Sequence, residues 1–185
     1  SATSLNCVAN DTFLSGHMVS SITEGEVKEK EAVVVSACND GVGVTIPHET
    51  WTVVPFPTIR ADENEYFDTT LSRFNPKTEG WYYINSNIYF QDTASTGFAV
   101  PTIHLNSAMI FSGEQSVFTS GSSNSCGVSG MVYMNGVDDF IEILVLQNSG
   151  SPVDLLPSSA YQTFTAHLIT GQSTGGGSGG GESIE

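Results

Sequence analysis

The stretch FNPKTEGWYYINSNIYF, residues 74–90, decides the fold, because a turn-rich charged half meets a run of aromatic residues there. Side chains alternate between the two faces of a strand, so a strand that begins at Gly80 sorts these residues into two rows. One row is largely apolar: Tyr82, Ile84, Ser86, Ile88 and Phe90. The other row holds rings and amides: Trp81, Tyr83, Asn85, Asn87 and Tyr89. The sequence therefore predicts a strand with a core face and a second face that is aromatic yet polar-tipped.

The second face of this strand indicates a contact between subunits. Tyr and Trp combine a large apolar ring with a hydrogen-bonding tip, and both are enriched at protein interfaces. We expect Trp81, Tyr83 and Tyr89 to lie in such an interface. Two alternatives remain open, an aromatic surface strand without a partner and packing between two sheets of one subunit.

A second stretch, DFIEILVLQN at residues 139–148, is also apolar on both sides. Ile141, Ile143 and Val145 fall on one face, while Phe140 and Leu144 fall on the other. Strands that are apolar on both faces are usually buried on both faces. In a single-domain sandwich this pattern again indicates an oligomer, so we add Phe140 and Leu144 to the expected interface.

The rest of the chain is rich in short apolar segments that Gly, Asn, Asp, Ser and Pro separate. The segments are 32–37, 40–47, 50–56, 98–106, 108–120, 126–135, 139–148 and 160–170. This spacing is typical of a β-sandwich or barrel, and we expect about ten strands. No stretch repeats apolar residues with the helical period over three turns, so very little helix is expected.

Composition divides the chain into three parts. Residues 1–30 are polar and are expected to form an N-terminal arm, residues 31–170 the β-domain, and residues 171–185 a flexible Gly/Ser-rich tail. No Lys follows the glycines of the tail, so it is not a phosphate-binding loop. No apolar run approaches the roughly 20 residues of a membrane-spanning helix.

The charge of the chain limits its partners. The 185 residues include 20 Asp and Glu but five Lys and Arg, which gives a formal net charge of −15. Such a chain is repelled by nucleic acid and by anionic membranes. It can meet a basic partner surface or bind cations.

The residue types that perform catalysis are scattered. His17, His48, His104 and His167 form no metal-binding motif, and no nucleophile elbow surrounds any serine. Three cysteines, Cys7, Cys38 and Cys126, lie far apart without a CxxC pair. We expect no enzyme activity and three free thiols, with a Cys7–Cys38 disulfide as the alternative.

Six residues of the domain have a characteristic spacing. They are Phe56, Asp62, Phe67, Phe74, Gly80 and Tyr82. The spacing resembles the signature of the C1q domain, a family with the jelly-roll fold of tumour necrosis factor that typically forms compact trimers. The family usually has aromatic residues where this chain has Ile84 and Ser86. The resemblance extends over residues 32–170 and implies a C1q/TNF-like jelly-roll homotrimer in which these six residues are structural.

Three longer stretches narrow the resemblance. TIPHETWTVVPF (45–56), FDTTLSRFNPKTEGWYYI (67–84) and SGMVYMNGVDDFIEILVLQNSG (129–150) are similar to C1q-like modules in structural proteins of tailed bacteriophages, marine ones in particular. Scarcity of cysteine agrees with synthesis in a host cytoplasm. The resemblance implies a trimer on the virion surface, as a head decoration or head fibre, held to the capsid or a fibre base by its terminal segments. The alternatives are a tail-fibre tip that binds a host glycan or protein, and a secreted C1q-like binding protein.

The resemblance also raises the question of calcium, because some C1q-like trimers hold it. The segment ADENEYFD places Asp62, Glu63, Glu65 and Asp68 close together in sequence, and carboxylate oxygens suit Ca²⁺. The segment lacks an EF-hand loop, so calcium is a secondary expectation and no other cofactor is predicted. Asp138 and Asp139 are expected to form a turn.

Overall fold

The computed structural model describes residues 32–93 and 96–171. The chain divides into two units, Ser1–Lys30 and Glu31–Glu185, and every described residue belongs to the second. The expected N-terminal arm and residues 172–185 of the tail lie outside the described residues. Within the described residues all regular structure is β, and no helix there is long and apolar enough to cross a membrane.

The first of two seven-stranded sheets, sheet A, is built around the long strand β7. Its strands are β1 (Val34–Cys38), β2 (Val44–Ile46), β4 (Thr58–Asp62), β7 (Gly80–Thr93), β11 (Ser122–Met134), β13 (Val153–Leu155) and β14 (Thr163–Gly171). One edge of β7 pairs with β11, and the other pairs first with β14 and then with β13. All of these pairs are antiparallel, and β7 is an inner strand of the sheet because both of its edges are paired.

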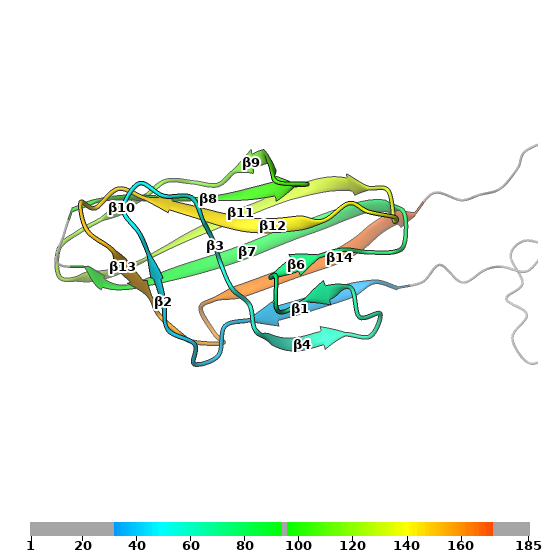
Figure 1. The fold of residues 1–185 in the computed structure, drawn as a ribbon, viewed down its shortest axis with the longest axis horizontal. Helices are drawn as coiled ribbons and strands as arrows, with labels where there is room; N and C mark the ends of the chain where they lie inside the picture. Colours follow the sequence, from blue (N-terminus) through cyan, green and yellow to red (C-terminus); the bar gives the residue numbers. More distant parts are fainter. Residues whose placement is uncertain (1–31, 94–95, 172–185) are drawn as a thin grey trace, which may run out of the picture. The chain divides into compact units, whose positions relative to one another are not determined.

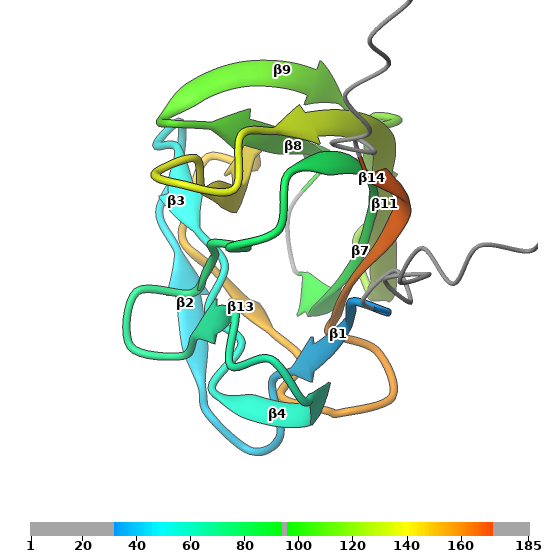
Figure 2. The same cartoon turned by 90° about the vertical axis from the view of Figure 1, so that its right-hand side faces the viewer.

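The second sheet, sheet B, is built around β8 and β12. Its strands are β3 (Thr52–Val53), β5 (Phe67–Asp68), β6 (Arg73–Phe74), β8 (Gly97–Leu105), β9 (Ala108–Ser112), β10 (Ser116–Phe118) and β12 (Ile141–Gln147). Strands β8 and β9 are joined by a two-residue turn in which Asn106 and Ser107 both have positive φ, as in a type I′ hairpin. Figures 1 and 2 show the two sheets facing each other as a curled sandwich.

The core between the sheets contains an aromatic cluster, which we define as Phe56, Phe67, Phe74, Tyr82 and Phe164. Phe164 lies at its centre, with ring centroids 5.0 Å from Phe67, 5.9 Å from Phe56 and 6.0 Å from Phe74. Small Ser86 is the register partner of Phe164, and its hydroxyl donates to the Thr163 carbonyl (2.9 Å). The small side chain of Ser86 on β7 therefore lies next to the large ring of Phe164 on β14.

The all-β expectation is confirmed, but the strands are more numerous than about ten, because several contain only two or three residues and have no clear period. The segment 108–120 forms two strands instead of one. The break is at Gly113, where an added Cβ would lie 2.2 Å from the Gly127 carbonyl oxygen. The chain turns there because it meets the backbone of β11.

The chain enters and leaves the domain at one pole. Val34 at the start of β1 pairs with His167, near the end of β14. The end of β14 lies beside Trp81 at the start of β7, and Met134 at the end of β11 pairs with Gly80. We call this end the terminal pole. The other end of β7 lies at the opposite pole (Figure 1).

Candidate interaction surfaces

The outward row of β7 joins rings from β11, β14 and the segment before β14. We define the aromatic face by its members: Trp81, Tyr83, Tyr89, Met131, Tyr133, Tyr161 and His167. Trp81 packs edge-on against Tyr133 with centroids 5.7 Å apart, and Tyr83 packs on His167 at 5.4 Å. Tyr89 stacks on Tyr161 at 4.8 Å. Trp81 keeps 47% and Met131 57% of its surface exposed, so the rings cover one another only in part.

The Tyr133 hydroxyl connects the aromatic face to a carboxylate. It donates a hydrogen bond to Glu79 at the terminal pole. This hydrogen bond is the main reason why the pKa of Tyr133 lies above its ordinary value of 10.0, with smaller contributions from burial and from the charges of Glu79 and Asp139. Tyr133 therefore stays protonated as a donor at neutral pH.

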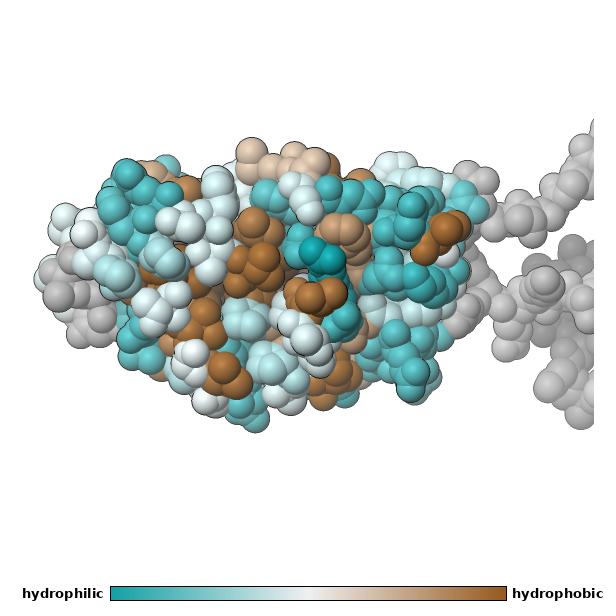
Figure 3. Space-filling view, viewed as in Figure 1, coloured by the Kyte–Doolittle hydropathy of each residue, from teal (hydrophilic) through white to brown (hydrophobic). Residues whose placement is uncertain are grey.

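The outward row of β12 lies on the opposite side of the sandwich from the aromatic face. Figure 3 shows this side, where hydrophobic side chains lie among hydrophilic ones. Residues of the same chain cover the row. The Arg73 guanidinium lies 4.2 Å from the centroid of the Phe140 ring, and its Nε donates to the nearly buried Glu142 carboxylate at 2.9 Å. Phe140 is thus partly covered within its own chain, and a place for Phe140 and Leu144 in a subunit interface stays a prediction.

The other covering contact on sheet B is between Trp51 and His104, whose rings are 6.1 Å apart. His104 Nε2 lies 3.1 Å from the hydroxyl of Thr102, which itself donates to the Leu144 carbonyl at 3.3 Å. Contacts within the chain thus cover part of the outward side of sheet B, while Leu144 and Leu146 stay partly exposed.

The signature residues have structural places. Phe56, Phe67, Phe74 and Tyr82 are buried in the aromatic cluster, and Gly80 begins β7. The two oxygens of the Asp62 carboxylate accept hydrogen bonds from the amides of Tyr66 (2.9 Å) and Phe67 (2.8 Å). Asp62 thereby fixes the turn that brings Phe67 into the cluster.

The acidic segment does not assemble into a metal-binding group. Asp68 accepts from the amides of Thr70 and Leu71, and Asp62 is used by the turn just described. Among the described residues, no three His, Cys, Asp or Glu side chains gather as ligands for one ion. The Asp62 and Asp68 carboxylates thus serve separate local turns, and calcium at Asp62, Glu63, Glu65 and Asp68 stays a prediction without a ligand cluster among the described residues.

Asp138 and Asp139 belong to a hydrogen-bonded turn at the terminal pole. The Asn135 side-chain oxygen accepts from the amides of Val137, Asp138 and Asp139 at 2.8–3.2 Å. The Asp139 carboxylate accepts from the Asn135 amide (2.8 Å) and from the Asn106 side chain (2.7 Å). Both carboxylates serve to close the loop between β11 and β12.

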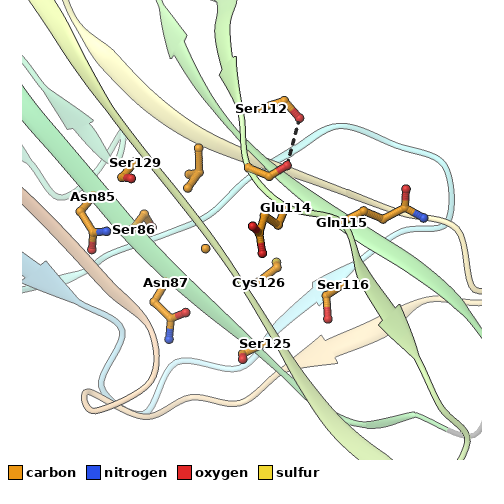
Figure 4. A pocket seen from close by; sticks show the side chains of 13 residues that line it. Asn85, Ser86, Asn87, Ser112, Glu114, Gln115, Ser116, Ser125, Cys126 and Ser129 are labelled. Carbon is orange, nitrogen blue, oxygen red and sulfur yellow. Dashed lines mark hydrogen bonds between the residues drawn. The ribbon is translucent and has the colours of Figure 1, made fainter.

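A polar pocket of about 680 Å³ crosses β11 where Gly127 lies. Asn85 and Asn87 lie on one side of it, and Glu114, Gln115 and Ser116 lie on the other, as Figure 4 shows. The remaining lining residues are Ser86, Ser112, Gly113, Ser125, Cys126, Gly127, Val128 and Ser129. The sequence did not reveal this pocket, because its polar residues come from two strands and a loop that are distant along the chain. The only available signal was the outward polar row of each strand.

The cysteines and histidines of the described region offer no reactive centre. Cys38 and Cys126 are free and buried, and burial raises the pKa of the Cys126 thiol to about 12. The thiol at the pocket wall is therefore protonated and a poor nucleophile. Cys7 and His17 lie outside the described residues. His48 Nδ1 accepts the Gly150 amide (3.1 Å), in a loop away from His104 and His167.

Comparison with solved structures identifies the fold. Eiger TNF from S. frugiperda is 13% identical, with a TM-score of 0.55 over 78% of this chain and 96% of that one. Murine APRIL at pH 5.0 is 15% identical, with a TM-score of 0.54 over 75% of this chain and 100% of that one. The globular domain of zebrafish complement 1qA is 13% identical, with a TM-score of 0.52 over 77% of this chain and 100% of that one.

No family model and no curated protein sequence matches the chain. The structural likeness at such low identity nevertheless confirms the expected architecture, an all-β jelly roll of the C1q and TNF type. It is a likeness of fold, and function has to be argued from the surfaces.

Proposed function

We propose that this protein is a non-enzymatic structural protein that forms a homotrimer through the aromatic face and is displayed on the surface of a tailed-phage particle. Head decoration or a head fibre is the role we favour, with residues 1–30 and 171–185 as the segments that attach it to the capsid or a fibre base. The observation that carries the proposal is the exposure of Trp81 and Met131 on a face rich in aromatic rings.

Charge supports contact through this face. The chain has a net charge of −15, so two copies repel each other over most approaches. The outward rows of β7, β11 and β14 contain Trp, Tyr, Met, Asn, Ser, Thr and His, without a single Asp, Glu, Lys or Arg between residues 81 and 89, 125 and 133, or 163 and 169. A face of this kind is where copies can meet with the least repulsion, and its Trp and Tyr side chains are typical interface anchors.

Two further observations support the trimer and its location. The sequence resembles the C1q domain, a family of compact trimers, and the structure has the matching fold. The longer stretches around residues 45–56, 67–84 and 129–150 resemble modules of phage structural proteins. Both terminal segments start from the terminal pole, which leaves the opposite pole free to face away from a particle.

The mass of the protein in solution tests the assembly. Wild type should have a mass near three 19.6 kDa chains by light scattering. Tyr83→Asp should yield the mass of one chain, because it places a carboxylate in the middle of the contact. Val53→Asp, on the opposite side of the sandwich, is the matched control and should remain trimeric. A trimer that persists in Tyr83→Asp, or that is lost in Val53→Asp, would contradict an interface on the aromatic face.

The location has its own test. Particles prepared with and without the chain should differ by a surface projection in negative-stain images. Protein that stays free of purified particles would refute the virion role and leave the trimer untouched.

A further inference from the structure

We propose that the polar pocket across β11 binds a neutral saccharide. Its volume of about 680 Å³ lies within the roughly 300–1,000 Å³ of small-molecule sites. The argument starts from side chains that face the pocket with unused hydrogen-bonding capacity.

Six polar side chains in the pocket make no hydrogen bond to the described part of the chain. They are Asn85, Glu114, Gln115, Ser116, Ser125 and Ser129. Asn87 is partly used, since its amide donates to the Tyr161 carbonyl at 3.1 Å and leaves its oxygen on the side of Gly127. Amides and hydroxyls both donate and accept, and a carboxylate accepts. Adjacent hydroxyls of a sugar ring, which also donate and accept, match this set.

Charge narrows the ligand class. No Lys, Arg or His lines the pocket, and Glu114 supplies its single charged group. Within a protein of net charge −15, an anionic ligand such as a phosphate ester or an acidic sugar would be repelled. A peptide ligand is disfavoured for two reasons. The pocket has few apolar side chains to hold one. A peptide strand also cannot pair with the edge of β11 at Gly127, because the backbone at Gly113 already lies against the Gly127 carbonyl.

Gly127 provides the independent observation. Glycine weakens the interior of a strand, and it often marks a place where a ligand or another backbone approaches closely. An added Cβ at Gly127 would meet only ordinary contacts, 3.4 Å from the Ser86 carbonyl and 3.7 Å from Asn87 Oδ1. Packing therefore does not require glycine here, in contrast to Gly113. The missing side chain leaves the floor of the pocket open between Asn87 and Glu114.

The probes are glucose, galactose, N-acetylglucosamine and maltose, titrated into the full-length ¹⁵N-labelled protein. We expect at least one of them to shift the side-chain amide signals of Asn85, Asn87 and Gln115 saturably, with a Kd of about 0.1–10 mM, which is typical of weak polar sites. Gly127→Val should abolish the shifts, because its side chain fills the floor without backbone strain. Gly43→Val, at an exposed glycine with open space around it, is the matched control and should bind as wild type does.

Two loop variants keep the proposal testable if Gly127→Val fails to fold. Gln115→Ala should weaken saccharide binding about threefold to tenfold, as expected for the loss of one hydrogen bond. Glu114→Gln should leave it within about threefold, because the amide still accepts a hydrogen bond. A large loss in Glu114→Gln would show that binding depends on the charge of Glu114 and overturn recognition by the neutral amides and hydroxyls. Silence of all four sugars at about 50 mM, or shifts that persist in Gly127→Val, would overturn the site.

The mass of each sample, measured alongside, separates this inference from the proposed assembly. Asn85 and Asn87 lie between Tyr83 and Tyr89 on the outward row of β7, so a neighbouring copy in the proposed trimer would compete with the sugar for the pocket. The same titration is therefore also run on Tyr83→Asp, in which the pocket is free of a neighbour. A Tyr83→Asp monomer that ignores all four sugars refutes the saccharide site alone. A wild-type monomer that binds them refutes the trimer alone.

Discussion

Strands β7 and β12 both have apolar residues on their two sides, yet their outward rows meet different surroundings. Phe140 on β12 lies under the Arg73 guanidinium, and the neighbouring Glu142 carboxylate is nearly buried beside the same arginine. Trp81 on β7 touches one ring and remains about half exposed. The difference teaches that a doubly apolar strand indicates covering of both faces, and that the cover can come from the same chain or from another copy.

The strongest test of this comparison uses two tryptophans of similar exposure. Trp51 on the sheet B side is 43% exposed and Trp81 on sheet A is 47% exposed. Trp81→Ala should weaken self-association by about 2–4 kcal/mol, the range of an interface hot spot, with little change in monomer stability. Sedimentation equilibrium over a dilution series measures this change.

Trp51→Ala is the matched variant. Trp51 packs on His104 of its own chain, so its loss should leave the association constant unchanged and lower the unfolding free energy by less than about 1 kcal/mol. If the two variants weaken association equally, the contrast between the two faces does not hold.

A smaller change in stability is expected on the outer side of β12, where Arg73 contacts Phe140 and Glu142. Glu142→Ala removes the partner of Arg73 and should lower the unfolding free energy by about 1–2 kcal/mol, with a discount because Arg73 is about a third exposed. Urea unfolding gives the value. The mass of the folded protein should stay that of wild type, whereas dissociation would mean that this face also holds subunits together.

The smallest effect concerns Tyr133 at the edge of the aromatic face. The pKa of this phenol is raised in the folded protein, chiefly by its hydrogen bond to Glu79. The stabilisation from the protonated phenol is therefore fully present below the ordinary tyrosine value of 10.0 and is lost as the pH rises through the raised pKa. The difference between the ultraviolet titrations of wild type and Tyr133→Phe gives the ionisation of this phenol, which should lie above pH 10.0. A difference curve centred at the ordinary value would mean that the Glu79 contact does not form in solution.

Local patterns were sufficient to predict much of the fold. The period of two in residues 80–90 predicted one row of β7 that is buried, Tyr82, Ile84, Ser86, Ile88 and Phe90, and one that is not. The resemblance of six spaced residues to the C1q signature implied the jelly roll, and four of the six lie in the aromatic cluster. The buried face of a strand follows from the period-two pattern of apolar residues, which can be read directly from the sequence.

Features that depend on distant chain segments could not be predicted. The cover of Phe140 requires Arg73, which lies far away in sequence and reaches it only because β6 pairs with β12. The division of 108–120 requires contact between Gly113 and Gly127, and the pocket depends on the same contact. The roles of Asp62 and Asp68 in separate turns could not be predicted either, because sequence proximity does not reveal which backbone amides each carboxylate binds.

The pairing of β1 with β14 has a mechanical consequence. Because Val34 and His167 are register partners, a force that pulls the two chain ends apart opens this pair one rung at a time, as a zipper opens. A force between both ends together and the opposite pole instead runs along β7, β11 and β14, where many hydrogen bonds share the load. A protein held by both ends would resist drag on its far pole, while the same domain strung between its two ends would yield easily.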